Sequence, residues 1–243
     1  MQRLLLKNNQ EKKSFDPISL TVYQSPYTKI RLGKEYDGGY VISEIPDNYK
    51  MILSGGISKD ISFEEDFLKK FPNSTCYAFD GTIEKLPKES QNVNFIKKNI
   101  ENKNTDNITN LHELINKNDS IFIKMDIEGS EIEWLDSLNK EQMNKFNQIV
   151  MEFHRPFGEK ERNTFNKLNK THILVHFHGN NCRGLRNHKG CQIPNIFECT
   201  YLHKKHFNTT PELNKDPLPG PLDMANKPTS GPELNLNYPP FVN

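Results

Sequence analysis

SIFIKMDIEGSEIEWL, residues 120–135, is the stretch of sequence that decides the fold. Its first half is a mostly apolar run of strand length, in which every second residue of 121–127 is apolar. The run leads into Asp126 and Glu128, and Ser130 then opens a helical pattern with early carboxylates. A strand that turns into a helix is half of a βαβ unit, whose ligands bind beyond the carboxyl ends of the strands. Asp126 and Glu128 are therefore expected at a functional rim; the alternative is that they only solvate the loop or cap the helix.

The overall composition is that of a single α/β domain with irregular extensions. With 243 residues, 34% of them hydrophobic, the chain is long enough for one sizeable core. A formal net charge of +1 provides no general attraction to nucleic acid or to a membrane surface, so neither is expected as a partner. No apolar run approaches the roughly 20 residues that span a bilayer, and four cysteines are too few for a disulfide framework. These features predict a cytoplasmic protein, and they do not indicate its oligomeric state.

Short apolar runs alternate with helical patterns along the rest of the chain. Besides the central stretch, strands are expected at 51–53, 75–79, 93–96, 149–153, 173–177 and 196–202, and helices at 63–71, 107–115 and 159–168. This alternation predicts an α/β fold with a mostly parallel seven-stranded sheet and helices on both faces. Only a loop precedes the last strand, which is therefore expected to run antiparallel beside the strand at 173–177. A glycine-rich turn at 37–39 predicts a hairpin-like lip before the first strand.

Three segments follow from these patterns. Residues 1–30 are expected to form an N-terminal arm, residues 31–206 the α/β domain, and residues 207–243 a C-terminal tail. Eight of the fifteen prolines lie in the tail, so neither helix nor sheet continues there. Disorder is one interpretation of this composition. Apolar residues recur every few positions, however, and they favour a tail that wraps the surface of the domain.

The ends of the first two expected strands suit a nucleoside. Ser54, Gly55 and Gly56 end the first strand before a helix, where glycines allow close approach to the backbone and free N–H groups face a ligand. Asp80 and Gly81 end the second strand, where a carboxylate can accept both hydroxyls of a ribose. No P-loop lysine accompanies them, so a nucleoside with a small anionic group, such as S-adenosylmethionine, fits better than a dinucleotide. Ordinary βα loops are the alternative.

Acids and imidazoles end the later strands. They are Asp126 and Glu128, Glu152 and His154, and His178 with Asn180 and Asn181. If the fourth, fifth and sixth strands lie side by side, these groups surround one crevice. Methyl transfer to a hydroxyl needs a group that removes the proton, and general-base catalysis contributes roughly 10²- to 10⁴-fold in rate. Asp126, Glu128 and His154 are the candidate catalytic residues, with an imidazole near its ordinary pKa. Alternatively, Asp126 and its neighbours hold a divalent metal such as Mg²⁺ or Mn²⁺; we favour the metal-free version.

Six runs in order along the chain carry a family resemblance. RLGKEYDGGYVI, ILSGGISKDISFEEDF, CYAFDG, FIKMDIEGSEIEWL, QIVMEFH and HFHGNN resemble the FkbM family of S-adenosylmethionine-dependent methyltransferases, and KMDIEGSE is the most specific piece. The resemblance implies a Rossmann-like methyltransferase fold and O-methylation of a small-molecule or glycan acceptor. It also implies that the two loop glycines and Asp80 bind the methyl donor and that residues 126–131 form the Asp-x-Glu-Gly-x-Glu signature. Leu53 departs from the family pattern, since many members have an acid there, and the loop lacks a later glycine.

Two other functions compete with methyl transfer. One is a zinc-stabilised binding module, because His176, His178, Cys182, His188 and Cys191 lie close together in sequence; their spacing is not that of a C-x-x-C motif. The other is a metal-dependent hydrolase built on the same acids and histidine as above, which leaves the glycine loop and the ribose acid unexplained.

No motif identifies the acceptor. The lip at 36–40, the loop at 179–195 and the tail are expected to build its side of the crevice. Arg183 and Arg186 indicate an anionic or sugar-phosphate acceptor, unless they are merely solvated.

Overall fold

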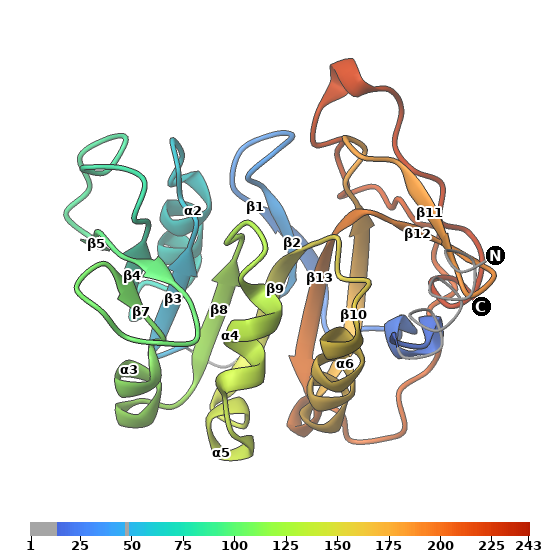
Figure 1. The fold of residues 1–243 in the computed structure, drawn as a ribbon, viewed down its shortest axis with the longest axis horizontal. Helices are drawn as coiled ribbons and strands as arrows, with labels where there is room; N and C mark the ends of the chain where they lie inside the picture. The colour runs from blue at the N-terminus through green and yellow to red at the C-terminus, as the bar shows by residue number, and fades with distance from the viewer. Residues whose placement is uncertain (1–13, 47–48) are drawn as a thin grey trace, which may run out of the picture.

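A seven-stranded sheet runs through the computed structural model, which describes residues 14–46 and 49–243 (Figure 1). Its strand order is β10-β13-β9-β8-β3-β4-β5. The strands are β3 (Met51–Gly55), β4 (Thr75–Phe79), β5 (Val93–Ile96), β8 (Ile121–Met125), β9 (Phe146–His154), β10 (His172–Gly179) and β13 (Ile196–His203). All neighbours are parallel except β13, which is antiparallel to both β9 and β10. The prediction of a seven-stranded, mostly parallel α/β sheet is confirmed.

The position of β13 differs from the prediction in one respect. β13 lies beside β10 and antiparallel to it, as expected, but it also lies between β9 and β10. The expectation that the fourth, fifth and sixth strands lie side by side is therefore wrong. β13 follows the hairpin of β11 (Leu185–His188) and β12 (Cys191–Pro194), and an antiparallel strand needs no crossover helix to return to the sheet.

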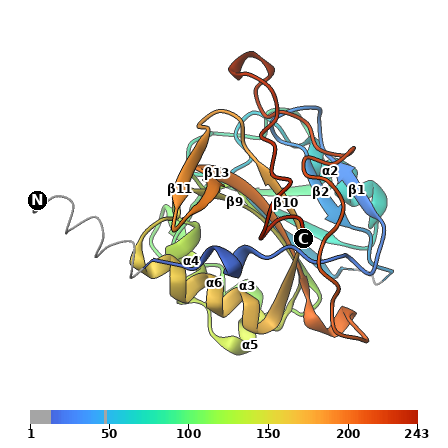
Figure 2. The ribbon, with the colours of Figure 1, turned by 90° about the vertical axis from the view of Figure 1, so that its right-hand side faces the viewer.

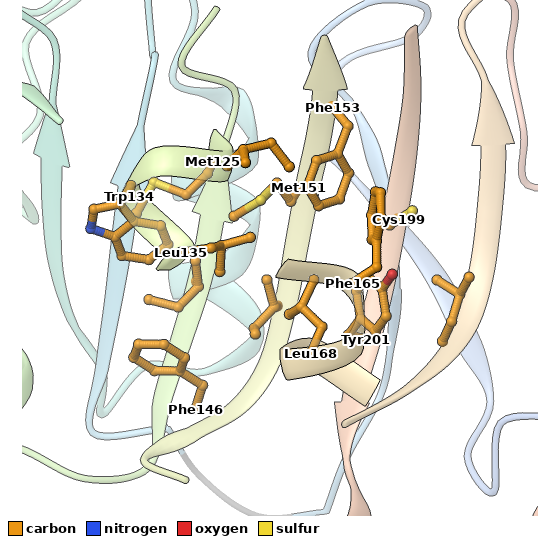
Figure 3. Packing of buried hydrophobic residues seen from close by; sticks show 14 of the residues in the cluster. Met125, Trp134, Leu135, Phe146, Met151, Phe153, Phe165, Leu168, Cys199 and Tyr201 are labelled. Atoms are coloured by element: carbon orange, nitrogen blue, oxygen red, sulfur yellow. The ribbon is translucent and has the colours of Figure 1, made fainter. Parts of the chain in front are cut away.

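Apolar residues alternate between two hydrophobic clusters along the central strands. In β9, Met151 and Phe153 belong to the first cluster and Val150 to the second. Figure 3 shows residues of the first cluster, including Trp134 of α4 (Glu131–Ser137) and Phe165 of α6 (Glu159–Thr171). α3 (His112–Lys117) and α5 (Lys140–Met143) also contribute residues to the first cluster. The central strands thus have the period-2 pattern of a sheet that is buried on both sides.

The second cluster combines a helix with a hairpin. α2 (Ser62–Lys70) contributes Phe63 and Phe67. The antiparallel strands β1 (Lys29–Leu32) and β2 (Tyr40–Ser43) form the lip predicted at the glycine-rich turn, and Tyr40 and Ile42 belong to the same cluster. The ring of Tyr40 contacts the ring of Phe63 edge-on, with centroids 5.6 Å apart. This contact fixes the hairpin against α2, beside the ends of the parallel strands.

The helix predicted at 107–115 is wrong over its first half. Ile108–Thr109 form the short strand β7, which pairs in parallel with β6 (Asn99–Ile100). Leu111 then has a left-handed backbone, with φ 63°, and the helix begins only at His112. Leu111 and Ile115 are four residues apart and both buried, as the apolar spacing predicted. The helix itself covers fewer of the predicted residues.

The C-terminal tail packs along the domain and beside the segment at 14–28 (Figure 2). Leu218, Leu236 and Phe241 are buried in the first cluster. The amide of Val22 donates to the carbonyl of Pro240 at 3.1 Å, which joins the two ends of the described chain. The rest of the expected N-terminal arm, residues 1–13, lies outside the described residues. Within the described part of the chain, no helix has the length and apolar character needed to cross a membrane.

Candidate functional site

A cavity of about 440 Å³ opens beyond the carboxyl ends of β3, β4 and β8. Its walls come from four loops, 56–58 after β3, 79–82 after β4, 99–101 at β6 and 126–130 after β8. The strand order reverses between β3 and β8, because β4 and β5 lie on one side and β9 on the other. Such reversal points are where open α/β sheets bind ligands, and the volume is in the range of small-molecule sites.

Gly56 sets the shape of the first loop. Its φ is +73°, and a Cβ atom there would lie 1.7 Å from the carbonyl oxygen of Asp126. The Gly56 amide donates to the carbonyl of Phe79 at 3.0 Å, which joins the loops after β3 and β4. Only glycine combines this backbone conformation with so close an approach. The neighbouring Ser54 was also predicted to contact the methyl donor, but it is fully buried. Its hydroxyl already donates a hydrogen bond to Glu64 Oε1 at 2.5 Å.

Asp80 is held rigidly at the end of β4 and is 6% exposed. Its Oδ2 accepts from the amide of Ser58 at 2.8 Å, and its Oδ1 accepts from the amide and hydroxyl of Thr82 at 2.8 and 2.6 Å. A carboxylate oxygen has two lone pairs, so Oδ1 is filled and Oδ2 retains one acceptor position. Gly81 donates its amide to Asn99 Oδ1 at 3.0 Å, behind this carboxylate.

Sequence reasoning missed the residues that β6 brings to the cavity. Asn99, Ile100 and Glu101 line it, and Glu101 adds a further carboxylate to the lining that contains Asp80. A signal was present, since these residues follow the third strand as Asp80 follows the second. They were overlooked because the loop from 97 to 110 has no regular pattern.

A second cavity of about 130 Å³ adjoins the first and shares Gly56, Ser58 and Asp126 with it. Charges of both signs line the second cavity: they are Lys34, Asp37, Lys59, Asp60, Glu64, Lys124 and Asp126. Lys124 is 5% exposed, donates to the carbonyl of Gly56 at 2.9 Å and lies 5.4 Å from the ring centre of Tyr40. The Tyr40 hydroxyl in turn donates to Asp126 Oδ2 at 3.2 Å. This cavity therefore suits a ligand group that carries both charges.

His154 lies at the centre of a group of carboxylates at the ends of β8 and β9. Its Nδ1 is 3.0 Å from Oε1 of buried Glu131. Its Nε2 lies 3.8 Å from Asp126 Oδ1, 3.5 Å from Glu128 Oε2 and 3.8 Å from Glu152 Oε2. The structure thus brings together the three predicted catalytic residues and adds Glu131 and Glu152.

The electrostatics of this group differ from the prediction. Burial lowers the pKa of His154, but the carboxylates of Glu131, Asp126 and Glu128 outweigh it, so the pKa is raised. The expectation of an unshifted imidazole is therefore wrong. Burial also raises the pKa of Glu152 well above its usual range, and nearby Asp126 and Glu198 raise it further. Excess negative charge surrounds one imidazole.

The helix after this loop begins differently from the prediction. Ser130 occupies the N-cap position of α4 but makes no side-chain capping bond. Instead, the carboxylate of Glu131 accepts from the amide of Gly129 at 3.0 Å while it also contacts His154. Glu128 precedes them with φ +53° and is 85% exposed on its side chain. In the signature, Glu131 therefore fixes the loop, whereas Glu128 projects from it into solvent.

Because β13 is inserted beside β9, Glu198 takes the place in which His178 was expected. The side chain of Asn180 donates to Glu152 Oε1 at 2.8 Å. His178 Nδ1 is 3.2 Å from Glu198 Oε2, and its Nε2 is 3.1 Å from Glu233 Oε2 in the tail. Asn226, also in the tail, donates to Glu198 Oε1 at 2.7 Å. No local pattern of the sequence could have placed these tail residues beside the strand ends.

The residues of the expected zinc module are not brought together. His176 contacts Asp223, His178 contacts Glu198, and His188 contacts the carbonyl of Phe15. Within residues 14–46 and 49–243, the group with metal-ligand geometry is instead Asp126, Glu152 and His154. Arg186, expected to favour an anionic acceptor, lies over the ring of Phe157 at 4.6 Å.

Comparison with known proteins gives one match. A family model described as the methyltransferase FkbM domain matches residues 24–181. The match spans the hairpin and the strands from β3 to β10, and it includes the lining of both cavities. No curated protein and no solved structure matches the chain significantly.

Proposed function

The chain belongs to the FkbM methyltransferase family, and we propose that it transfers a methyl group from S-adenosylmethionine to a hydroxyl of a small molecule or glycan. One observation carries the proposal. A cavity of suitable size lies at the reversal of strand order, with the buried carboxylate of Asp80 on one wall and the acidic signature at 126–130 on another. The same strand order supports a Rossmann-like methyltransferase fold.

The larger cavity fits the adenosine part of the donor. Asp80 Oδ2 has one acceptor position for a ribose hydroxyl, and Glu101 is available for the other. The side chains of Phe79, Ile100 and Ile127 supply apolar surface for the adenine ring. They come from β4, from β6 and from the loop after β8, and this apolar surface supports a nucleoside over a simple anion.

The smaller cavity fits the amino-acid part of the donor. Lys59 can pair with its carboxylate and Asp37 with its ammonium group, while Lys34 and Asp60 already pair with each other at 3.6 Å in the same wall. Asp126 lines both cavities, which supports a position for it where the two parts of the donor would meet. When bound, S-adenosylmethionine supplies a methyl group on a positively charged sulfur, and the surrounding carboxylates favour that charge.

His154 and Asp126 are the groups that can accept the acceptor's proton. Glu131 holds the imidazole at Nδ1, so Nε2 faces the strand ends. Because the pKa of His154 is raised, more of the imidazole is protonated at neutral pH than expected for a free side chain. We therefore expect turnover to rise with pH through that pKa, as the base form becomes available.

Binding of S-adenosylhomocysteine, the demethylated donor, tests the proposal. Calorimetry should show one site, and the ligand should raise the melting temperature, since a ligand at 100 times its Kd stabilises by about 2.7 kcal/mol. NAD serves as the comparison ligand and should have no effect, because its second nucleotide exceeds the adjoining cavity. An absence of S-adenosylhomocysteine binding, or equal binding of NAD, would contradict the proposal.

A further inference from the structure

We propose that Asp126, Glu152 and His154 form a binding site for a divalent cation of the Mn²⁺ class. One ligand atom from each residue lies within 4.8 Å of the other two. The ligand set is mixed, with two carboxylate oxygens and one imidazole nitrogen. Such a set suits Mn²⁺ better than Ca²⁺, which is typically bound by oxygen atoms alone. The site itself does not depend on the donor; only the role of the ion in methyl transfer rests on the proposed function.

Each of the three residues is fixed through its other polar atom. Tyr40 donates to Oδ2 of Asp126 at 3.2 Å, and Asn180 donates to Oε1 of Glu152 at 2.8 Å. The three remaining atoms, Asp126 Oδ1, Glu152 Oε2 and His154 Nε2, therefore face one another. Partners that hold ligands in this way are the usual second layer of metal sites.

The imidazole has the orientation of a metal ligand. Its Nδ1 is 3.0 Å from Glu131, a carboxylate that is 1% exposed, so a proton on Nδ1 is shared with Glu131. The lone pair of Nε2 then faces the carboxylates of Asp126 and Glu152, each at 3.8 Å. A lone pair facing two carboxylates is unfavourable unless a cation or a proton lies among them.

An unused oxygen atom provides a separate observation. Asp126 Oδ1 is closed to solvent and has no hydrogen-bond partner. A buried polar atom without a partner is unfavourable. Among the described residues, no lysine or arginine forms an ion pair with Asp126 or with Glu152, which is 4% exposed. A divalent cation would satisfy Oδ1 and offset the negative charge at once.

The distances require little movement. Ligand atoms about 2.1–2.3 Å from one ion lie roughly 3.0–3.6 Å apart, so each carboxylate oxygen at 3.8 Å from Nε2 needs to approach it by only a few tenths of an ångström, and the two oxygens already lie within 4.8 Å of each other. Three protein ligands leave open positions for water or for a hydroxyl of the acceptor. An ion there would lower the pKa of that hydroxyl; with Nε2 bound to the ion, this effect would replace the imidazole as the means of activating the hydroxyl.

Titration of the purified, metal-free full chain with MnCl₂, followed by electron paramagnetic resonance of free Mn²⁺, tests the site without donor or acceptor. We expect one ion per chain. Glu152→Gln and His154→Gln should each weaken binding at least tenfold, and Glu131→Gln should weaken it by about tenfold, as expected for a second-layer partner. Asp119→Asn removes an exposed acid at the other end of β8 and is the matched control.

Three outcomes would overturn the proposal: no binding at millimolar Mn²⁺, binding that the substitutions leave unchanged, or an equal loss in the Asp119 control. The first outcome would mean that protons on His154 and Glu152 balance the carboxylates. Circular dichroism of each variant identifies any that do not fold; Glu131→Gln keeps Glu152 and His154 intact and provides a second route to the answer. S-adenosylhomocysteine binding, measured separately, shows whether a failure concerns the ion or the proposed function.

Discussion

The two halves of the strand-end rim are built in opposite ways. On the β3–β4 side, Asp80 is satisfied by three donors from nearby loops, at 2.6–2.8 Å. On the β8–β9 side, Glu152 and Asp126 crowd one imidazole, and Asp126 Oδ1 has no hydrogen-bond partner. The first half is thus preformed for a neutral nucleoside, whereas the second half is poised to take up positive charge. From this difference we propose that the first half binds the donor and that the second half carries the chemistry.

The largest expected effect concerns the first half. Gly56→Ala places a Cβ atom 1.7 Å from the Asp126 carbonyl oxygen at a left-handed φ. We expect a loss of more than about 3 kcal/mol in the free energy of unfolding, or undetectable S-adenosylhomocysteine binding. Thermal melts and calorimetry measure both quantities.

Gly184→Ala is the matched control for that substitution. Gly184 also has a positive φ, +62°, but an added Cβ would meet nothing within 4 Å. We expect a cost of about 1 kcal/mol, with donor binding kept. Equal costs at the two glycines would show that backbone strain, and not the approach of the two loops, decides the requirement for Gly56.

The next largest effect should separate the two halves. Asp126→Asn and His154→Ala remove candidate proton acceptors; Asp126 lines the larger cavity, but asparagine keeps its size there, and Asp80 and the apolar lining are unchanged. We expect methyl transfer to fall about a hundredfold or more, with S-adenosylhomocysteine bound nearly normally. Transfer from labelled donor to a hydroxylated acceptor found by screening provides the rate. If turnover is unchanged, the acids and imidazole only stabilise the loop before α4.

A smaller effect is expected at the ribose acid. Asp80→Ala removes one acceptor for the donor and also the bonds that hold Ser58 and Thr82. We expect a tenfold or greater rise in the Kd of S-adenosylhomocysteine, since hydrogen bonds to charged groups contribute roughly 1.5–3 kcal/mol. Asp119→Ala should leave the Kd unchanged. An unaltered Kd in Asp80→Ala would remove this residue from the donor site.

The smallest effect should be a pH dependence of the tail. Burial lowers the pKa of His178, but Glu198 and Glu233 raise it well above the ordinary value. A raised folded-state pKa means that the stabilisation is complete below the unfolded pKa of about 6.5 and is lost as pH rises through the folded value. Hydrogen exchange of residues 220–233 should therefore be slower at pH 6 than at pH 9, beyond the intrinsic change. His178→Gln should abolish the difference; its persistence would place the titrating group elsewhere.

The same contrast explains how far the sequence could be interpreted. All seven strands were predictable because each is a short apolar run that ends in polar residues. Gly56, Asp80 and Asp126 were found because each directly follows a strand, and parallel strands bring such positions to one edge. These positions could be recognised from the sequence next to each strand, and the pairing of the strands in the sheet then brings them together in space.

The other half of the rim could not be predicted in this way. Glu198 reaches Glu152 only because β13 enters between β9 and β10, and strand order depends on contacts far apart in the chain. Asn226 and Glu233 belong to the tail. The path of the tail depends on the packing of Leu218 and Leu236 in the first hydrophobic cluster. The raised pKa of His154 likewise depends on three carboxylates whose approach no spacing reveals.

The insertion of β13 has a consequence for dissecting this chain. The family match ends at residue 181, before β13 begins at Ile196. A fragment cut at the end of the match would lose the strand that bonds both β9 and β10. β9 and β10 would then each have an edge of unpaired backbone N–H and C=O groups where β13 had been. Unprotected edges of this kind pair with strands from other molecules. We expect such a fragment to aggregate during expression, because the residues that the family model matches do not complete the sheet.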